Sequence, residues 1–417
     1  MAREIEFPKK FLWGASVSAH QVEGGLHNQW TVWELENAKA LSVQAEYHYN
    51  DLESWPQAKQ LAKLSANYVS GRATDHFRRF ETDFDLAKQL RLTAFRFSIE
   101  WSRVEPEEGM WNAEAIDYYK QYVAALRGRG LEPVMTLFHF TLPVWFAQQG
   151  GFEKRSNIHY FVRFAEKIVS ELGGSVRYIL TINEPEVYAF ESYEKGHWPP
   201  AHLSFWQALK VYRNLAVAHN RVYTTLHELR RTYKISYAKH SIYMYPGDDA
   251  WLTRMSAGLG QWLFDDYWIR KTIKKADFLG ITWHTSQRVY GYRVHNPEQR
   301  MSDLGTSMDP GDIEHSLARL YQKYKKPLLI TGNGVADGED SFRKWWLSET
   351  VMAMQRAIRS GVPVIGYIYQ SLTDGFEWDK GRWPRFGLYK IDYRTLERTP
   401  RASAVWFGKL LKKLRSE

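Results

Sequence analysis

One glutamate in this sequence stands where a general acid or base would be expected. Residues Thr181–Pro185 read Thr-Ile-Asn-Glu-Pro and end a short apolar run, so Glu184 lies between Asn183 and the rigid Pro185. A carboxyl group that is partly buried at the end of a strand has a raised pKa and can exchange a proton near neutral pH. A motif this short also fits an ordinary surface loop, so its weight depends on what the other strands carry at their ends.

Other polar side chains follow apolar runs in the same way. Eight short apolar runs end in polar residues, and they are Phe11–Ser18, Ala94–Trp101, Pro133–Phe140, Tyr178–Pro185, Lys234–His240, Asp277–His284, Pro327–Asn333 and Val364–Ser371. The polar residues at or just beyond the ends are Gln21, Arg96, Glu100, His139, Asn183, Glu184, Lys239, His284, Asn333 and Gln370. We expect these side chains to converge if the runs are neighbouring parallel strands.

The stretches between the runs have helical patterns. Apolar residues recur at helical spacing in Glu114–Arg129 and Asn157–Leu172, and Thr82 is a candidate N-cap for a helix over Thr82–Gln89. Strands that alternate with helices predict a parallel sheet, and eight such units predict its closure. The sequence therefore predicts an α/β fold, a (β/α)₈ barrel of the TIM type. Residues 1–417 would form a single domain with its active site at the carboxyl ends of the strands.

The composition is that of a globular protein with many aromatic residues. Hydrophobic residues make up 44%, charged residues 25% and aromatic residues 15% of the chain. Sugar sites use aromatic faces, but a large barrel also buries many rings, so the aromatic content leaves both interpretations open. The chain has no cysteine, which excludes disulfides and thiolate metal sites. This fits a reducing compartment, a thermophilic source or an engineered chain.

The charge and the ends of the chain predict a small-molecule partner. The net charge is +9, but Lys and Arg are scattered except for Lys409, Lys412, Lys413 and Arg415, which alternate with leucines as on the solvated face of a helix. We therefore expect no nucleic-acid partner. No run of 18 apolar residues suggests a membrane span, and the first residues have no apolar segment of a signal peptide. We expect a cytoplasmic protein with no membrane partner.

Taken together, the strand-end motifs resemble those of the family 1 glycoside hydrolases, the β-glucosidase and β-galactosidase group, over essentially the whole chain. The stretches that carry the resemblance are Phe11–Ala15 with Gln21–Gly24, Arg96–Arg103, Leu137–Phe140, Thr181–Pro185, Trp198–Pro200, Phe376–Trp378 and Arg385–Leu388. The large number of motifs in the same order leaves little room for chance.

The resemblance implies a role for each matching residue. Glu184 would be the acid/base, and Asn183 would bind the sugar 2-hydroxyl. Gln21, His139 and Glu377 would bind other sugar hydroxyls, Trp378 would shape the sugar subsite, and Arg96 would lie beneath the nucleophile and keep it ionised. The mechanism would be double displacement through a covalent glycosyl-enzyme, with two carboxylates about 5–5.5 Å apart. It requires no cofactor and no metal.

The sequence departs from the family at the nucleophile. Family members have Ile-Thr-Glu-Asn-Gly at the end of the seventh strand, whereas this chain has Ile-Thr-Gly-Asn-Gly, with Gly332 at the glutamate position. Glycine has no oxygen to attack the anomeric carbon, and we expect it to leave a hole about the size of a carboxylate.

Further departures concern the same pocket. Thr282 and His284 replace the family Asn and Tyr of the sixth strand, and Gln370 replaces the Trp of the eighth. Gly375 replaces the Asn of a following Asp-Asn pair, and Thr306 replaces the Trp of a Gly-Trp-Glu loop. Random drift would scatter changes over the surface, so their concentration indicates remodelling of one pocket. Engineering explains it better than natural divergence towards another ligand.

Three functions are compatible with such a pocket. The first is an inactivated or glycosynthase-like β-glycosidase in which Glu184 still serves as a base, with native hydrolysis severely impaired. The second is a barrel equipped for non-glycosidic acid/base chemistry, in which Glu184 or Glu377 is the base and His284 is a second acid/base or only a hydrogen-bonding replacement for Tyr. The third is a binding protein for a new ligand, for example a flat aromatic molecule. A metal site of His139, His284 and Glu184 is poorly supported, because such residues are ordinary at a barrel mouth.

Overall fold

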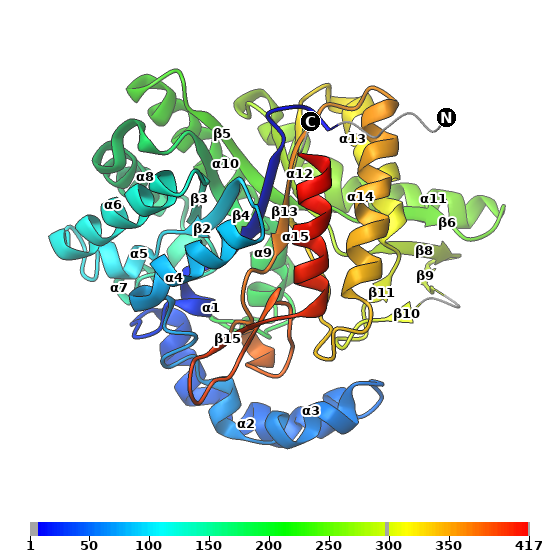
Figure 1. Ribbon diagram of the computed structural model, residues 1–417, viewed down its shortest axis with the longest axis horizontal. Coiled ribbons are helices and arrows are strands. Elements are labelled where there is room, and N and C mark those ends of the chain that lie inside the picture. Colours follow the sequence, from blue (N-terminus) through cyan, green and yellow to red (C-terminus); the bar gives the residue numbers. More distant parts are fainter. Residues whose placement is uncertain (1–6, 297–299, 416–417) are drawn as a thin grey trace.

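Eight parallel strands form a closed barrel in the computed structural model, which describes residues 7–296 and 300–415 (Figure 1). Around the barrel the order is β1-β13-β12-β7-β5-β4-β3-β2. The strands are β1 (Leu12–Ser16), β2 (Ala94–Ser98), β3 (Glu132–Phe138), β4 (Tyr178–Asn183), β5 (Lys234–His240), β7 (Leu279–Thr282), β12 (Leu328–Asn333) and β13 (Val364–Gln370). The predicted (β/α)₈ barrel is confirmed, and each barrel strand overlaps one of the eight predicted runs.

Helices surround the barrel and extend its loops. They are α1 (Ala19–Val22), α2 (Gln29–Tyr49), α3 (Trp55–Ala62), α4 (His76–Gln89), α5 (Trp101–Val104), α6 (Ala113–Gly128), α7 (Val144–Gln148), α8 (Ile158–Leu172), α9 (Pro185–Tyr193), α10 (Phe205–Leu229), α11 (Trp251–Gln261), α12 (Tyr267–Thr272), α13 (Ile313–Tyr324), α14 (Arg343–Arg359) and α15 (Ala402–Leu414). Within the described ranges, no helix combines the length and apolar character needed to cross a bilayer.

Two of the three predicted helices are confirmed, and the start of the third is corrected. α6 and α8 match the predicted ranges to within one residue at each end. α4 begins at His76 rather than at Thr82, so Thr82 lies inside the helix and is not its N-cap. The helix starts earlier because buried His76 hydrogen-bonds Asp83 at 2.7 Å and thereby fixes its first two turns to each other.

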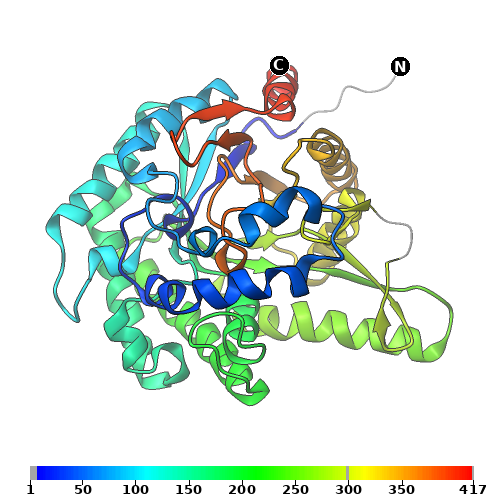
Figure 2. The ribbon, with the colours of Figure 1, turned by 90° about the horizontal axis from the view of Figure 1, so that it is seen from below.

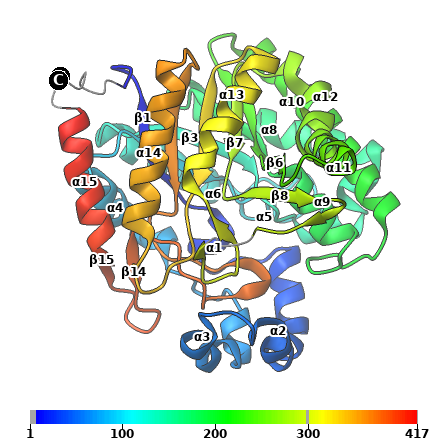
Figure 3. The ribbon, with the colours of Figure 1, turned by 90° about the vertical axis from the view of Figure 1, so that its right-hand side faces the viewer.

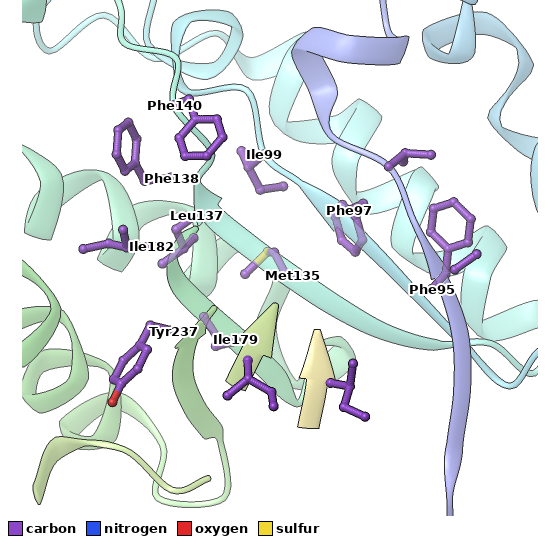
Figure 4. Packing of buried hydrophobic residues seen from close by; sticks show 14 of the residues in the cluster. Phe95, Phe97, Ile99, Met135, Leu137, Phe138, Phe140, Ile179, Ile182 and Tyr237 are labelled. Carbon is purple, nitrogen blue, oxygen red and sulfur yellow. The ribbon is translucent and has the colours of Figure 1, made fainter. Parts of the chain in front are cut away.

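The core lies in two layers. Inside the barrel, seven buried residues form a small cluster, and they are Ala94, Val134, Leu180, Ala238, Phe278, Leu329 and Ile368. Between strands and helices lies a much larger cluster, part of which Figure 4 shows around Phe97, Met135 and Ile182. Many of the aromatic rings, Trp101 and Trp283 among them, are buried in this outer layer, so they belong to packing rather than to a ligand site.

Loops and short elements cover one end of the barrel. α2 and α3 lie beyond that end, as the views from below and from the side show (Figures 2 and 3). The short strands of the loops are β6 (Tyr243–Pro246), β8 (Ser286–Tyr290), β9 (Arg293–Val294), β10 (Arg300–Met301), β11 (Ser307–Met308), β14 (Tyr389–Ile391) and β15 (Arg398–Pro400). These additions deepen the mouth at the carboxyl ends of the strands, where barrel enzymes hold their sites.

A buried ion-pair network joins the loop after β13 to the segment that leads through β14 to the start of α15. The carboxylate of Asp374 is fully buried and accepts hydrogen bonds from both terminal nitrogens of Arg401, at 3.0 and 3.1 Å. It also accepts from Arg385 and from the backbone N–H groups of Gly387 and Ile391. This network fixes the start of the loop that carries Gly375, Glu377 and Trp378 to the segment that follows it in the chain.

We expect the variant Asp374→Ala to lower the free energy of unfolding by about 3–5 kcal/mol, because it leaves buried arginine charge without its carboxylate. Denaturant-induced unfolding measures the change. Asp249→Ala is the matched control, since the Asp249–Arg254 pair is exposed at 99% and 61%, and it should leave the unfolding midpoint unchanged. Equal effects of the two substitutions would contradict this role for Asp374.

Candidate active site

A cavity of about 280 Å³ opens at the carboxyl ends of the barrel strands. Its wall contains most of the residues that the sequence singled out, namely Gln21, Arg96, His139, Asn183, Glu184, His284, Thr306, Gln370, Gly375, Glu377 and Trp378. Gly332 and Thr282 lie beneath this wall rather than on it. The carboxyl ends of the parallel strands therefore bring together residues that are up to 357 positions apart in the chain, as we expected from the sequence.

Three of the strand-end residues predicted to converge do not face the cavity. Glu100 is buried in contacts with Ser102 and Thr141, and Asn333 accepts hydrogen bonds from Trp346 and Tyr367. Lys239 is fully buried and turns towards Glu186, whose carboxylate lies 3.2 Å from its ammonium group. For these residues the prediction was wrong. Lys239 lies between Ala238 and His240 on β5, so the pleat turns it away from the barrel interior, whereas Glu100 lies beyond the end of β2 and Asn333 follows a register shift in β12.

Glu184 is fixed by its backbone at the junction of β4 and α9. Its φ angle of 39° is in the left-handed region, and its N–H donates to the carbonyl of Ala238 on β5 at 2.7 Å. Burial raises the pKa of its carboxyl group, while the charges of His284, Arg96 and Lys239 and a hydrogen bond from Thr282 lower it. A carboxyl group held in this balance can act as an acid or a base.

Arg96 connects four strands beneath the cavity. From β2, its guanidinium donates to the Thr136 hydroxyl of β3 at 3.2 Å, to the Asn183 side-chain oxygen of β4 and to the Thr331 carbonyl of β12 at 2.7 Å. Burial lowers the pKa of Arg96 to about 10, and the charge of Glu184 opposes this effect. Among the described residues, no carboxylate forms an ion pair with this guanidinium at hydrogen-bonding distance, so neutral oxygens solvate it.

The space beside Gly332 is not the empty hole that the sequence predicted. A Cβ atom at this position would lie 3.0 Å from the Thr282 methyl group and 3.2 Å from the Gln370 side-chain oxygen. Both contacts are tighter than ordinary van der Waals distances. The Thr282 and Gln370 side chains occupy the region in front of the backbone, so the prediction of an empty, carboxylate-sized hole was wrong.

The residues proposed to hold a sugar form one side of the cavity. Gln21 donates to Glu377 at 2.9 Å, and Trp378 stacks on His139 with ring centroids 6.1 Å apart. Burial raises the pKa of Glu377 to about 8 and lowers the pKa of His139 well below its ordinary value. Nδ1 of His139 is buried without a hydrogen-bond partner. The wall therefore presents neutral polar groups, as a site for hydroxyls requires.

His240, the last residue of β5, belongs to the site although it was not among the residues predicted from the sequence. It lines the cavity between Glu184 and His284, and its ring lies 5.9 Å from the His284 ring. The sequence did indicate this residue, because the fifth apolar run ends at His240. Only its neighbour Lys239 was predicted to point into the site. The end of an apolar run does not determine which of two adjacent residues faces the barrel mouth, and in β5 it is His240.

Within residues 7–296 and 300–415, no group of three His, Asp or Glu side chains is arranged to hold a metal ion. His139, His284 and Glu184 all line the cavity, but they do not form such a group.

The raised pKa of Glu377 predicts a pH-dependent stability. Because its folded value of about 8 exceeds the ordinary 4.5, the folded protein holds a proton that the unfolded chain loses between these pH values. This stabilisation is complete below pH 4.5 and disappears as the pH rises through 8. In Glu377→Gln the group is neutral at every pH, so from pH 5 to 8 its free energy of unfolding should fall less than that of the parent, by a few kcal/mol.

Denaturant titrations at pH 5, 6, 7 and 8 measure this difference. Glu46→Gln is the matched control, because the Glu46 side chain is 58% exposed, and its curve should parallel that of the parent. A Glu377→Gln curve that also parallels the parent would contradict a protonated Glu377.

Known proteins resemble this chain along nearly its whole length. β-Glucosidase A of Acetivibrio thermocellus is 27% identical over 460 residues, which cover 98% of this chain and 99% of that protein. A chloroplastic galactolipid galactosyltransferase of Arabidopsis thaliana is 29% identical over 454 residues, covering 97% of this chain and 72% of the relative.

Solved structures give the same result. The β-glycosidase from Pyrococcus horikoshii superposes with a TM-score of 0.86 at 32% identity, covering 99% of this chain and 95% of that chain. The β-glucosidase from Thermotoga maritima in complex with glucoimidazole has a TM-score of 0.85 at 22% identity, which shows the shared fold. The family model described as glycosyl hydrolase family 1 matches residues 3–282 and 253–415. The chain therefore belongs to glycosyl hydrolase family 1.

Proposed function

We propose that this family 1 barrel binds β-glycosides and their sugars but does not hydrolyse them by double displacement, and that Glu184 acts in it as a glycosynthase-like acid/base. One observation carries the proposal. The cavity combines Glu184 with Gln21, His139, Asn183, Glu377 and Trp378, to which the family resemblance assigns sugar binding. Gly332 has the sequence position that the same resemblance assigns to the nucleophile.

Loss of hydrolysis follows from the chemistry at position 332. Double displacement requires an anionic oxygen that forms a bond to the anomeric carbon, on the side opposite the acid/base. Gly332 supplies none, and the nearest side chains, Thr282 and Gln370, supply a hydroxyl and an amide. Both groups are far weaker nucleophiles than a carboxylate, so hydrolysis should fall by several orders of magnitude.

Transfer remains possible because Glu184 keeps its place. In the parental chemistry, an ionised nucleophile beside the acid/base raises its pKa by repulsion. Here that charge is absent. Burial still raises the pKa of Glu184, while His284, Arg96 and Lys239 favour its ionised form. Ionised Glu184 can take a proton from an acceptor hydroxyl while the acceptor attacks a donor that already carries a leaving group on the other face. A relative named for galactosyl transfer rather than hydrolysis supports this direction.

Binding without turnover is the second candidate, and the crowding beside Gly332 favours it. Thr282 and Gln370 take up part of the space that a leaving group on the far face would need. A protein of this kind, or one equipped for non-glycosidic acid/base chemistry, would give no coupled product from a glycosyl fluoride. A pure binding protein would show a ligand-dependent rise in melting temperature instead.

The first experiment measures turnover of nitrophenyl β-glucoside by the parent, by Gly332→Glu and by the triple variant Gly332→Glu/Thr282→Asn/Gln370→Trp, with and without formate. We expect no turnover by the parent and weak turnover with formate. Hydrolysis should rise most in the triple variant, because the single substitution meets Thr282 and Gln370 at about 3 Å. Adding Glu184→Gln to the triple variant should lower hydrolysis again.

The second arm supplies the parent with α-glucosyl fluoride and a nitrophenyl sugar acceptor. A coupled β-linked product that disappears in Glu184→Gln supports the glycosynthase-like function. Sugar binding without any product supports the binding candidate. Hydrolysis of the nitrophenyl glucoside by the parent at the rate of the triple variant would overturn the proposal.

A further inference from the structure

One long helical segment at the surface has an apolar outward face. α11, the turn Trp262–Asp266 and α12 follow one another without a break along the chain. Large apolar side chains recur on the exposed face of this segment at helical spacing, and we call them the α11 stripe: Trp251, Met255, Leu259, Trp262 and Leu263. Trp251 is 73% exposed. Single apolar residues are common on surfaces, but a contiguous row of them marks an interaction site.

This segment is inverted relative to an ordinary surface helix, which turns its apolar face to the core. The inward residues of α11 are Thr253, Ala257 and Gln261, and all three are buried. The Gln261 side chain accepts from the backbone N–H of Met244 at 2.9 Å, and the Thr253 hydroxyl accepts from that of Gly291 at 2.7 Å. Small and hydrogen-bonded residues therefore fix α11 to the protein, and its large apolar side chains are left for another surface.

Basic side chains continue the stripe along the same segment. Arg270 and Lys274 follow it at helical spacing and are exposed. The ammonium group of Lys271 lies over the Tyr267 ring at 5.0 Å, and that ring lies 5.9 Å from the ring of Trp262. The cations, which we call the basic rim (Arg270, Lys271 and Lys274), therefore adjoin the apolar face.

No exposed carboxylate lies within this segment. Between Trp251 and Lys275 the acidic residues are Asp265 and Asp266. Both are buried, and they pair with Arg319 and Lys323 of the neighbouring helix α13. The outward surface of the segment thus carries positive charge without its own negative charge.

The basic surface extends to α10. A shallow groove of about 450 Å³ is lined by Trp206 and four basic residues, namely Arg155, Lys210, Arg213 and Lys271. Lys210 lies 3.8 Å from the Glu153 carboxylate, whereas the other three cations form no ion pair within residues 7–296 and 300–415. Figure 3 shows α10, α11 and α12 on one side of the molecule, so the groove and the basic rim belong to the same face.

We propose that the α11 stripe and the basic rim form a docking surface for an anionic lipid bilayer, with the helical segment lying in the plane of the interface. Apolar side chains then enter the boundary of the acyl chains, where tryptophan is favoured, and the cations contact charged headgroups. The sequence predicted no membrane partner because no apolar run could span a bilayer. Lying on a bilayer requires only one apolar face beside basic residues.

Other occupants fit this surface less well. In a symmetric pair of chains both basic rims would lie in one interface, where like charges repel. A nucleic acid would match the basic rim but would leave the α11 stripe against a polar, charged surface. A bilayer with anionic headgroups satisfies both the apolar stripe and the cations.

The test measures co-sedimentation of the full-length protein with vesicles of phosphatidylcholine alone and of equal parts phosphatidylcholine and phosphatidylglycerol. We expect clear binding to the mixed vesicles and much weaker binding to the neutral ones. Added salt should weaken binding to the mixed vesicles, because it screens the attraction between the basic rim and the headgroups.

Leu259→Ser/Leu263→Ser removes the centre of the stripe and should weaken binding to the mixed vesicles by about tenfold or more, because less apolar surface leaves water. The two leucines are 55% and 52% exposed, so the substitutions spare the core. Leu35→Ser/Val43→Ser is the matched control, since these residues of α2 are 72% and 74% exposed, and it should leave binding unchanged.

Lys271→Glu/Lys274→Glu reverses two charges of the basic rim and should weaken binding to the mixed vesicles by about tenfold or more, with no loss for neutral vesicles. Lys409→Glu/Lys412→Glu makes the same change of net charge on α15, which Figure 3 shows on the other side of the molecule from α11. This control should bind nearly as the parent does.

Unfolding midpoints verify that every variant is folded. Equal binding to neutral and mixed vesicles, no binding to either, or an equal loss in a variant and its control would overturn the docking surface. A parent that ignores vesicles but forms a dimer, which Leu259→Ser/Leu263→Ser dissociates in sedimentation equilibrium, would assign the stripe to a second copy instead. The proposed function concerns the cavity and does not depend on these results.

Discussion

The buried guanidinium of Arg96 is the constraint on which the rest of the site depends. A cation without access to water must be surrounded by oxygen atoms, or its burial would be strongly unfavourable. Arg96 meets this requirement by joining β2 to β3, β4 and β12 through Thr136, Asn183 and the Thr331 carbonyl. The same contacts fix Asn183, and therefore the start of the segment that carries Glu184.

Gly332 places no carboxylate beside this arrangement. Arg96 is held by neutral acceptors, and the nearby charge of Glu184 raises its pKa against the effect of burial. The two effects on Glu184 then oppose each other, since burial favours the neutral acid while the surrounding cations favour the base. Burial prevails, because the pKa of Glu184 is raised above its ordinary value, so the carboxyl group can hold a proton and can also release it to act as a base.

Several side chains around Gly332 share one small volume. Thr282 and Gln370 approach the glycine from the two neighbouring strands, and the rings of His284 and His240 lie close to each other in the cavity wall. Elsewhere the wall holds the Gln21–Glu377 hydrogen bond and the stacked rings of His139 and Trp378.

The sequence by itself determined the barrel, the strand ends and the chemical identity of the site. Apolar runs set the strands, the motif around Glu184 predicts the acid/base, and a glycine at position 332 has no carboxylate in any fold. Only the tertiary structure decided that Lys239 turns away while His240 faces the cavity, and that Thr282 and Gln370 fill the space beside Gly332. The physical reason is that residue type and local pattern fix what a strand end carries. The direction of its last side chains, and what occupies a vacated volume, depend on packing between strands that are remote in the sequence.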